Sequence, residues 1–210
     1  MKTSLALAVV VTVMPTMLVG NQQVGPTSLF DGKTFSGWEG NLARFRVESG
    51  AIVAGTLAAP IERNEFLCTT REFKDFELRL RVKLLGGEKA NAGVQFRTAR
   101  IPNHHEVSGF QADMGTGWWG ALYDESRRKT VLQGPDQARM TGVIKEGEWN
   151  DYTVRADGPH VQLSINGFQT VDYVEADPTV AGSGVICVQI HSGPASEAWY
   201  RDITIAELKK

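Results

Sequence analysis

Polar side chains that could do acid–base chemistry fall on one face of a predicted strand near the end of the chain. Residues 184–191 read Gly-Val-Ile-Cys-Val-Gln-Ile-His, and in a strand alternate side chains point to opposite faces. The face with the isoleucines is expected to be buried, which leaves Gln189 and His191 together on the other face. Because the charge of histidine changes near neutral pH, His191 is a candidate acid or base.

Two further predicted strands carry a similar polar face. Gln95 and Arg97 alternate with apolar neighbours in one strand, and Gln111 and Asp113 do so in the next. If the three polar faces meet on one concave sheet surface, their groups could bind a sugar-sized ligand with many hydroxyls. The alternative is that each polar face is simply solvated and that His191 is an ordinary surface histidine.

Two adjacent tryptophans lie in a loop flanked by glycines. Trp118 and Trp119 cannot easily both turn inward, so at least one is expected to be exposed or to line a cleft. An exposed indole ring could stack on the apolar face of a sugar ring. The alternative is that both rings pack inward and anchor the loop.

Several common catalytic signatures are missing from the sequence. It contains no Glu-x-Asp-x-x-Glu strand, which would carry the acid and nucleophile of a retaining glycoside hydrolase. Gly-x-Ser-x-Gly, Gly-x-Gly-x-x-Gly, P-loop and Cys-x-x-Cys motifs are also missing. The loop residues His104, His105 and Glu106 could ligate a metal, but no other spaced histidine or cysteine supports such a site, so we interpret them as a solvated loop.

The rest of the chain reads as short strands separated by glycine-rich turns, with no amphipathic helix longer than a turn or two. Asn166-Gly167 is a strong two-residue hairpin signal, because both positions tolerate positive φ. This pattern predicts an all-β fold, a two-sheet antiparallel jelly-roll sandwich. The predicted strands are 45–53 (with a turn at Ser49-Gly50), 66–70, 75–84, 93–98, 109–113, 152–157, 160–165, 168–173, 184–191 and 200–207. The predicted core comprises Phe76, Leu78, Leu80, Val82, Val161, Leu163, Ile165, Ile186, Val188, Ile190, Ile203 and Ile205.

The length, the net charge and the N-terminal residues indicate the number of domains, the partners and the cellular location. The 210 residues suffice for one domain. With 22 Lys and Arg against 24 Asp and Glu, the chain has no excess of positive charge to attract a polyanion, so nucleic acid is not an expected partner. Lys2 precedes an apolar stretch over residues 5–13, which predicts a signal peptide at residues 1–20. A periplasmic or secreted protein, without a stable membrane span after cleavage, is expected; an uncleaved anchor is the alternative. Cys68 and Cys187 lie in apolar runs and are predicted to be buried free thiols, a single disulfide being the alternative.

Seven motifs follow one another in order along the chain. They are Ser28-Leu-Phe-Asp-Gly-Lys-Thr-Phe-Ser-Gly-Trp38, Thr70-Arg-Glu-Phe-Lys-Asp-Phe-Glu-Leu78, Asn91-Ala-Gly-Val-Gln-Phe-Arg97, Gly109-Phe-Gln-Ala-Asp113, Gly120-Ala-Leu-Tyr-Asp124, Glu148-Trp-Asn-Asp-Tyr152 and Trp199-Tyr-Arg-Asp-Ile203. This ordered set resembles the 3-keto-disaccharide hydrolase domain family, formerly a domain of unknown function. The resemblance covers residues 27–208 and implies a single domain with a concanavalin A-like lectin/glucanase fold, in an exported bacterial protein. Where the family usually has Asn-Ser-Gly, this chain has Asn91-Ala-Gly, which removes one hydroxyl.

The resemblance implies cleavage of a glycoside that carries a ketone at carbon 3. The ketone acidifies the proton on carbon 2, so a base can remove it, the glycosidic oxygen can leave by β-elimination, and water can add afterwards. Such a site needs a base, a donor for the enolate oxygen and an acid for the leaving group.

Each of these roles has candidates in the sequence. His191 fits the base, Arg97 or Gln111 the donor, and Asp113, Glu65 or Tyr123 the acid. A divalent cation could replace the enolate donor. A non-catalytic glycan-binding module and a purely structural surface domain are the alternatives. The expected ligand is an oligosaccharide or glycoside, and the other expected binding residues are Asn91, Gln95, Gln189, Trp118 and Trp119.

Overall fold

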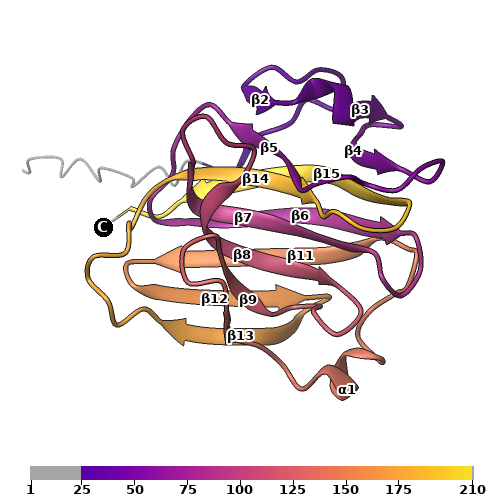
Figure 1. The fold of residues 1–210 in the computed structure, drawn as a ribbon. Coiled ribbons are helices and arrows are strands. Elements are labelled where there is room, and N and C mark those ends of the chain that lie inside the picture. Colours follow the sequence, from indigo (N-terminus) through magenta and orange to yellow (C-terminus); the bar gives the residue numbers. More distant parts are fainter. Residues whose placement is uncertain (1–24, 210) are drawn as a thin grey trace, which may run out of the picture.

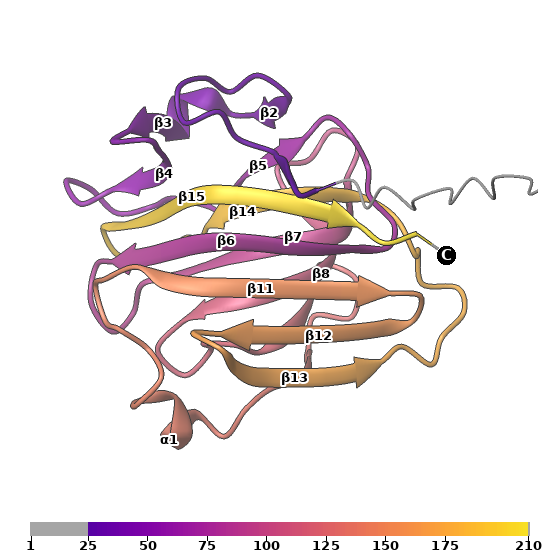
Figure 2. The same ribbon diagram turned by 180° about the vertical axis from the view of Figure 1, so that it is seen from behind.

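The computed structural model describes residues 25–209, which form two antiparallel sheets packed face to face. Sheet A has the strand order β13-β12-β11-β6-β15-β4-β3, with β1 also paired to β15, and Figure 2 shows this sheet nearest the viewer. Its strands are β1 Thr27–Ser28, β3 Phe45–Glu48, β4 Ala51–Thr56, β6 Phe76–Leu85, β11 Asn150–Asp157, β12 His160–Ile165, β13 Phe168–Val174 and β15 Ser196–Glu207.

Sheet B has the order β10-β9-β8-β7-β14-β5-β2 and lies on the side seen in Figure 1. Its strands are β2 Trp38–Gly40, β5 Glu65–Thr69, β7 Asn91–Arg100, β8 Val107–Gly115, β9 Leu122–Glu125, β10 Val131–Gln133 and β14 Val185–Ile190. Within residues 25–209 the helices are limited to the 3-10 turn η1 Leu42–Arg44 and the single-turn α1 Gln137–Met140. None of the helices in this range is long and apolar enough to cross a membrane.

The core lies between the two sheets and is built by period-two alternation. In β6 the buried residues alternate with residues that are more exposed, which is the pattern expected for a sheet with one wet face. All twelve residues predicted for the core are at most 3% exposed, so that prediction is confirmed. Asn166 and Gly167 both have positive φ between β12 and β13, which confirms the predicted hairpin turn. The predicted signal peptide, residues 1–20, lies outside the described residues.

The cysteines differ from the sequence-based prediction. Cys68 and Cys187 form a disulfide rather than two free thiols. Because β5 and β14 are antiparallel neighbours, the register places these two residues directly opposite each other, and both side chains are fully buried. The two cysteines are 119 residues apart in the sequence, so no local pattern predicted that their strands would be neighbours.

Candidate functional site

The three predicted polar faces meet on the outer face of sheet B, because β14, β7, β8 and β9 are consecutive neighbours there. One row of paired residues runs from Gln189 through Gly93 to Asp113. The next row runs from Cys187 through Gln95 and Gln111 to Tyr123. Residues opposite each other in an antiparallel sheet point to the same side, so the register gathers these polar groups into one cluster.

A hollow of about 400 Å³ opens over this cluster and is called the main hollow here. Six of the residues that the sequence predicted for the site line it, and they come from three strands and two loops. The sequence analysis missed the other five, of which two, Lys89 and Glu125, are charged. Glu125 lies two residues after Tyr123 on the same face of β9, so the same alternation argument could have found it. Lys89, in the loop before β7, carried no signal. The lining residues are Lys89, Asn91, Gln111, Asp113, Trp118, Tyr123, Glu125, His191, Ser192, Gly193 and Pro194.

A chain of buried amides holds the Asp113 carboxyl beside the main hollow. Gln95 Nε2 donates to Gln111 Oε1 at 2.5 Å, and Gln111 Nε2 donates to Asp113 Oδ1 at 2.5 Å. The side chain of Gln111 lies over Gly93, where a Cβ atom would come within 2.7 Å of its Cδ atom. Any larger residue at position 93 would therefore displace the amide that orients Asp113.

Burial changes the acidity of Asp113. The side chain is 2% exposed, and desolvation raises its pKa to about 8, with a smaller contribution from the charge of Glu125 and a partial offset from the Gln111 hydrogen bond. The carboxyl is thus mostly protonated at neutral pH. Within residues 25–209, its Oδ2 atom has no hydrogen-bond partner, and neither does the Gln189 amide, although both are buried. Unpartnered buried polar atoms are costly and are often found where a ligand or water binds.

His191 follows β14 directly and lines the main hollow. Its Nδ1 atom lies 2.7 Å from the carbonyl oxygen of Ser192. Since a carbonyl oxygen only accepts, Nδ1 carries the proton, and the neutral ring has its lone pair on Nε2. Its backbone N–H donates to the Asn91 carbonyl, which fixes the residue against β7. The arrangement provides a base with a defined free nitrogen.

The adjacent tryptophans point in different directions. Trp118 is 43% exposed, lines the main hollow and meets the Tyr123 ring edge-to-face at 6.3 Å. Trp119 is only 4% exposed, belongs to the core between the sheets and, contrary to the prediction, does not line the main hollow. The positive φ values of Gly117 and Gly120 allow the tight turn that sends the two rings apart.

Arg97 lies away from the main hollow, contrary to the prediction. Its backbone has φ 45°, and the pairing registers shift beside it, so the regular alternation of β7 fails at this residue. The guanidinium donates to the carbonyls of Lys74 and Gly158, at 2.7 and 2.6 Å, and pairs with Asp75 at 3.0 Å. Arg97 therefore joins loops at one end of the sandwich and is not in a position to meet an enolate at the main hollow.

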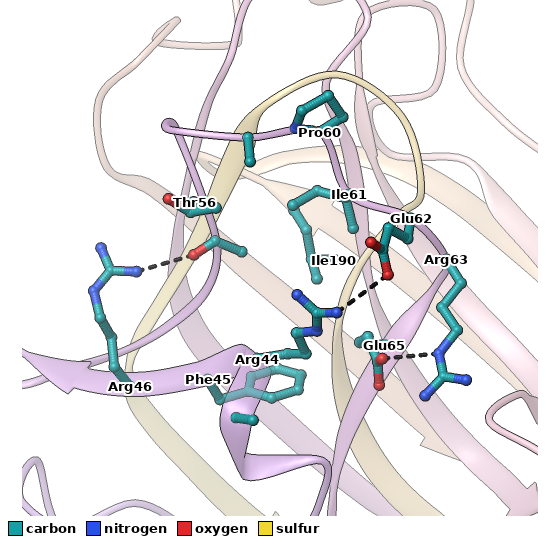
Figure 3. A pocket seen from close by; sticks show the side chains of 13 residues that line it. Arg44, Phe45, Arg46, Thr56, Pro60, Ile61, Glu62, Arg63, Glu65 and Ile190 are labelled. Atoms are coloured by element: carbon teal, nitrogen blue, oxygen red, sulfur yellow. Dashed lines mark hydrogen bonds and ion pairs between the residues drawn. The ribbon is translucent and has the colours of Figure 1, made fainter.

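Glu65, which the sequence analysis proposed as an acid of the site, also lies away from the main hollow. It pairs with Ile190, and so its side chain shares the inner face of sheet B with that core residue. Glu65 lines a separate crevice, whose volume is about 160 Å³, together with Ile190. Figure 3 shows its ion pair with Arg63. Glu65 Oε1 also accepts from Asn41. Because both faces of β5 are buried, its sequence gave no signal for which face Glu65 occupies.

No group of three or more His, Cys, Asp and Glu residues that could hold a metal ion occurs within residues 25–209. His105 instead pairs with Glu106, and His104 accepts a hydrogen bond from the Glu106 backbone.

The comparisons place the chain in a family. The family model described as a 3-keto-alpha-glucoside-1,2-lyase-like domain matches residues 25–206, and the chain belongs to that family. A search of curated proteins gave no match.

Several solved structures have a similar fold. A provisionally assigned glycosyl hydrolase from Parabacteroides distasonis ATCC 8503 is 18% identical, with a TM-score of 0.66 over 88% of this chain and 94% of that one. The carbohydrate-binding module CBM66 from Bacillus subtilis is 11% identical, with a TM-score of 0.60 over 81% of this chain and 96% of that one. A protein of unknown function with a galectin-like fold, also from Bacillus subtilis, is 13% identical, with a TM-score of 0.63 over 82% and 90%. The predicted fold, an all-β jelly-roll sandwich of the concanavalin A-like lectin/glucanase type, is confirmed.

Proposed function

We propose that the protein cleaves 3-keto-glycosides by base-assisted β-elimination followed by hydration. The family and the fold support a carbohydrate-related function. The finer assignment rests on one observation, the position of His191 and the buried Asp113 around a single hollow. A module that only binds sugar needs neither a free imidazole nitrogen nor a carboxyl kept neutral by burial.

His191 would act as the base. Its Nε2 lone pair would take the proton from carbon 2 of the keto sugar, and the electrons of that bond would delocalise onto the ketone oxygen. As the bond from carbon 1 to the leaving oxygen breaks, a double bond forms between carbons 1 and 2. Water would then add across this double bond and regenerate a free keto sugar.

Asp113 would stabilise the enolate rather than protonate the leaving group. Because its Oδ1 accepts from Gln111, the proton of the neutral carboxyl belongs on Oδ2, the atom without a partner among residues 25–209. A neutral carboxylic acid in a dry site is an effective donor to a developing oxyanion. This role replaces the one expected of Arg97, which lies elsewhere. A divalent cation bound by the Asp113 carboxylate in place of its proton is a second proposal for the stabilisation of the enolate.

The test is turnover of a 3-keto-glucosyl disaccharide by the purified protein in D₂O, beside the unoxidised parent disaccharide. We expect release of the second sugar from the keto substrate alone, with deuterium at carbon 2 of the product above the level without protein. Equal cleavage of the parent, or no cleavage of the keto substrate, would contradict the proposal. Parallel assays with EDTA and with added divalent cations test the cation.

His191→Ala should lower this turnover by about 10²–10⁴-fold, which is the usual contribution of a positioned base. His160→Ala is the matched control, because His160 lies on β12 of sheet A and pairs with Asp172. A normal rate for His191→Ala would show that the base is another residue.

A non-catalytic glycan-binding module is the second candidate. The similarity to the module CBM66 and the exposed Trp118 at the main hollow favour it. A glycan array with the same preparation tests this function, and binding without turnover of any keto-glycoside would support it. We also propose a periplasmic or secreted location, from the N-terminal sequence pattern; cell fractionation and N-terminal sequencing of the mature protein test that location.

A further inference from the structure

A second hollow adjoins the main hollow on the outer face of sheet B. Its volume is about 500 Å³, and it is lined by residues of β9, of the loop between β7 and β8 and of the loop between β9 and β10. Tyr123 and Glu125 line both hollows and therefore form a shared wall. The lining residues of the second hollow are Ile101, His104, Glu106, Tyr123, Glu125, Ser126 and Lys129.

The second hollow is tied to the loop that holds His191. Asn64 Nδ2 donates to Glu106 Oε1 at 3.1 Å, while Asn64 Oδ1 accepts from the Ser192 backbone N–H at 2.9 Å. Asn64 thus connects the acidic wall of the second hollow with the residue that follows His191. The base and the second hollow are held in a fixed relation by one side chain.

Glu125 is positioned between the two hollows by β9. Alternation sends Leu122 and Asp124 to one side of the strand and Tyr123 and Glu125 to the other. Glu125 Oε1 accepts from the Ser126 backbone N–H at 3.2 Å. Glu106 also lines the second hollow, and its Oε2 atom is buried with no partner among residues 25–209.

The surroundings raise the pKa of Glu125 far enough that about half of its carboxyls are protonated at pH 7. Burial raises its pKa to about 7, the charge of Glu106 adds to the rise, and the Ser126 hydrogen bonds and Lys129 partly offset it. The titratable groups around Glu125 are Lys89, His104, Glu106, Asp113, Tyr123, Lys129 and His191.

We propose that the second hollow binds the leaving sugar and that Glu125 donates the proton to its oxygen as the glycosidic bond breaks. This inference rests on the proposed function. It also rests on the buried, unpartnered Asp113 Oδ2 in the main hollow, which assigns the keto sugar to that side and the leaving sugar to the other.

The protons that His191 and Glu125 gain or lose in the elimination are restored in the hydration. In the elimination, carbon 2 gives its proton to His191 and Glu125 gives its proton to the leaving oxygen. In the hydration, the attacking water gives a proton to the Glu125 carboxylate as its oxygen bonds to carbon 1, and His191 returns a proton to carbon 2. Both residues end in their starting states.

Leaving-group dependence tests the role of Glu125. A sugar alcohol needs protonation to leave, whereas a nitrophenol departs readily as its anion. Glu125→Gln should therefore lower kcat/KM by about 10²–10⁴-fold for a 3-keto-glucosyl disaccharide and by less than about tenfold for 4-nitrophenyl 3-keto-glucoside. Glu72→Gln, at an exposed residue between β5 and β6, is the matched control and should leave both values of kcat/KM unchanged.

The outcomes separate this inference from the proposed function. If the wild-type protein cleaves neither substrate, the proposed function fails. If it cleaves both, and Glu125→Gln lowers kcat/KM equally for the two substrates or leaves both values unchanged, Glu125 is not the proton donor.

Two further variants probe the second hollow. Glu106→Gln should move the alkaline fall of kcat/KM for the disaccharide to lower pH, and His104→Ala should raise KM for the disaccharide but not for methyl 3-keto-glucoside. Wild-type values for both variants would overturn the assignment of the second hollow.

Discussion

Asp113→Asn should make the protein more stable at alkaline pH while it removes activity. The pKa of Asp113 rises from an ordinary value of 3.8 to about 8 because the carboxyl is buried. The folded protein therefore binds this proton more tightly than the unfolded chain, and the free energy of unfolding falls as pH rises from about 4 to about 8. The difference of about four pH units, at about 1.4 kcal/mol each, gives a loss of about 6 kcal/mol above pH 8. Asparagine keeps the shape and the acceptor for Gln111 but carries no charge at any pH.

Urea unfolding of the wild type and Asp113→Asn between pH 4 and pH 9 measures this effect. The two proteins should be about equally stable near pH 4, and the variant should be more stable by several kcal/mol above pH 8. Asp31→Asn should behave oppositely at neutral pH, because hydrogen bonds from Thr34 and Lys33 lower the pKa of Asp31 to about 2 and its carboxylate stabilises the fold above its ordinary pKa. Parallel pH profiles for the wild type and Asp113→Asn would refute the reasoning, since the carboxyl would then be ionised at no cost.

The remaining predictions separate structural from functional residues. Trp118→Ala should weaken glycoside binding by about 1–2 kcal/mol with an unchanged melting temperature, whereas Trp119→Ala should destabilise the fold by about 3–5 kcal/mol; titration calorimetry and thermal unfolding distinguish them. Arg97→Met should destabilise by about 3–5 kcal/mol, because it removes the cation that pairs with the half-buried Asp75 carboxylate and two hydrogen bonds to loop carbonyls, yet the folded fraction should keep its turnover per molecule. A lower kcat with normal stability would show instead that Arg97 acts in the site. Replacing both Cys68 and Cys187 by alanine should cost about 2–5 kcal/mol in denaturant unfolding, since the bond closes a loop of 119 residues, and equal midpoints with and without reductant in the wild type would argue against it.

Local alternation was enough to predict much of the candidate site. Gln189, Gln111 and Asp113 lie in strands with one clearly apolar face, and His191 directly follows such a strand. The period of two therefore predicted the side on which each residue points. Whether those sides would meet was left to the order of strands in sheet B. The neighbours β14, β7 and β8 are separated by long stretches of chain or by loops, and no local rule specifies such pairing.

What the sequence by itself determined is the all-β architecture, most strand positions, the core residues and the face of each regularly alternating strand. These features follow from interactions between residues close in the chain. The tertiary structure alone decided the exceptions: a backbone irregularity turned Arg97 away, the pairing of Glu65 with Ile190 put that carboxylate on the inner face, and pairing across 119 residues formed the disulfide. The acidity of Asp113 belongs to the same group, because it depends on burial and on groups brought together from several strands.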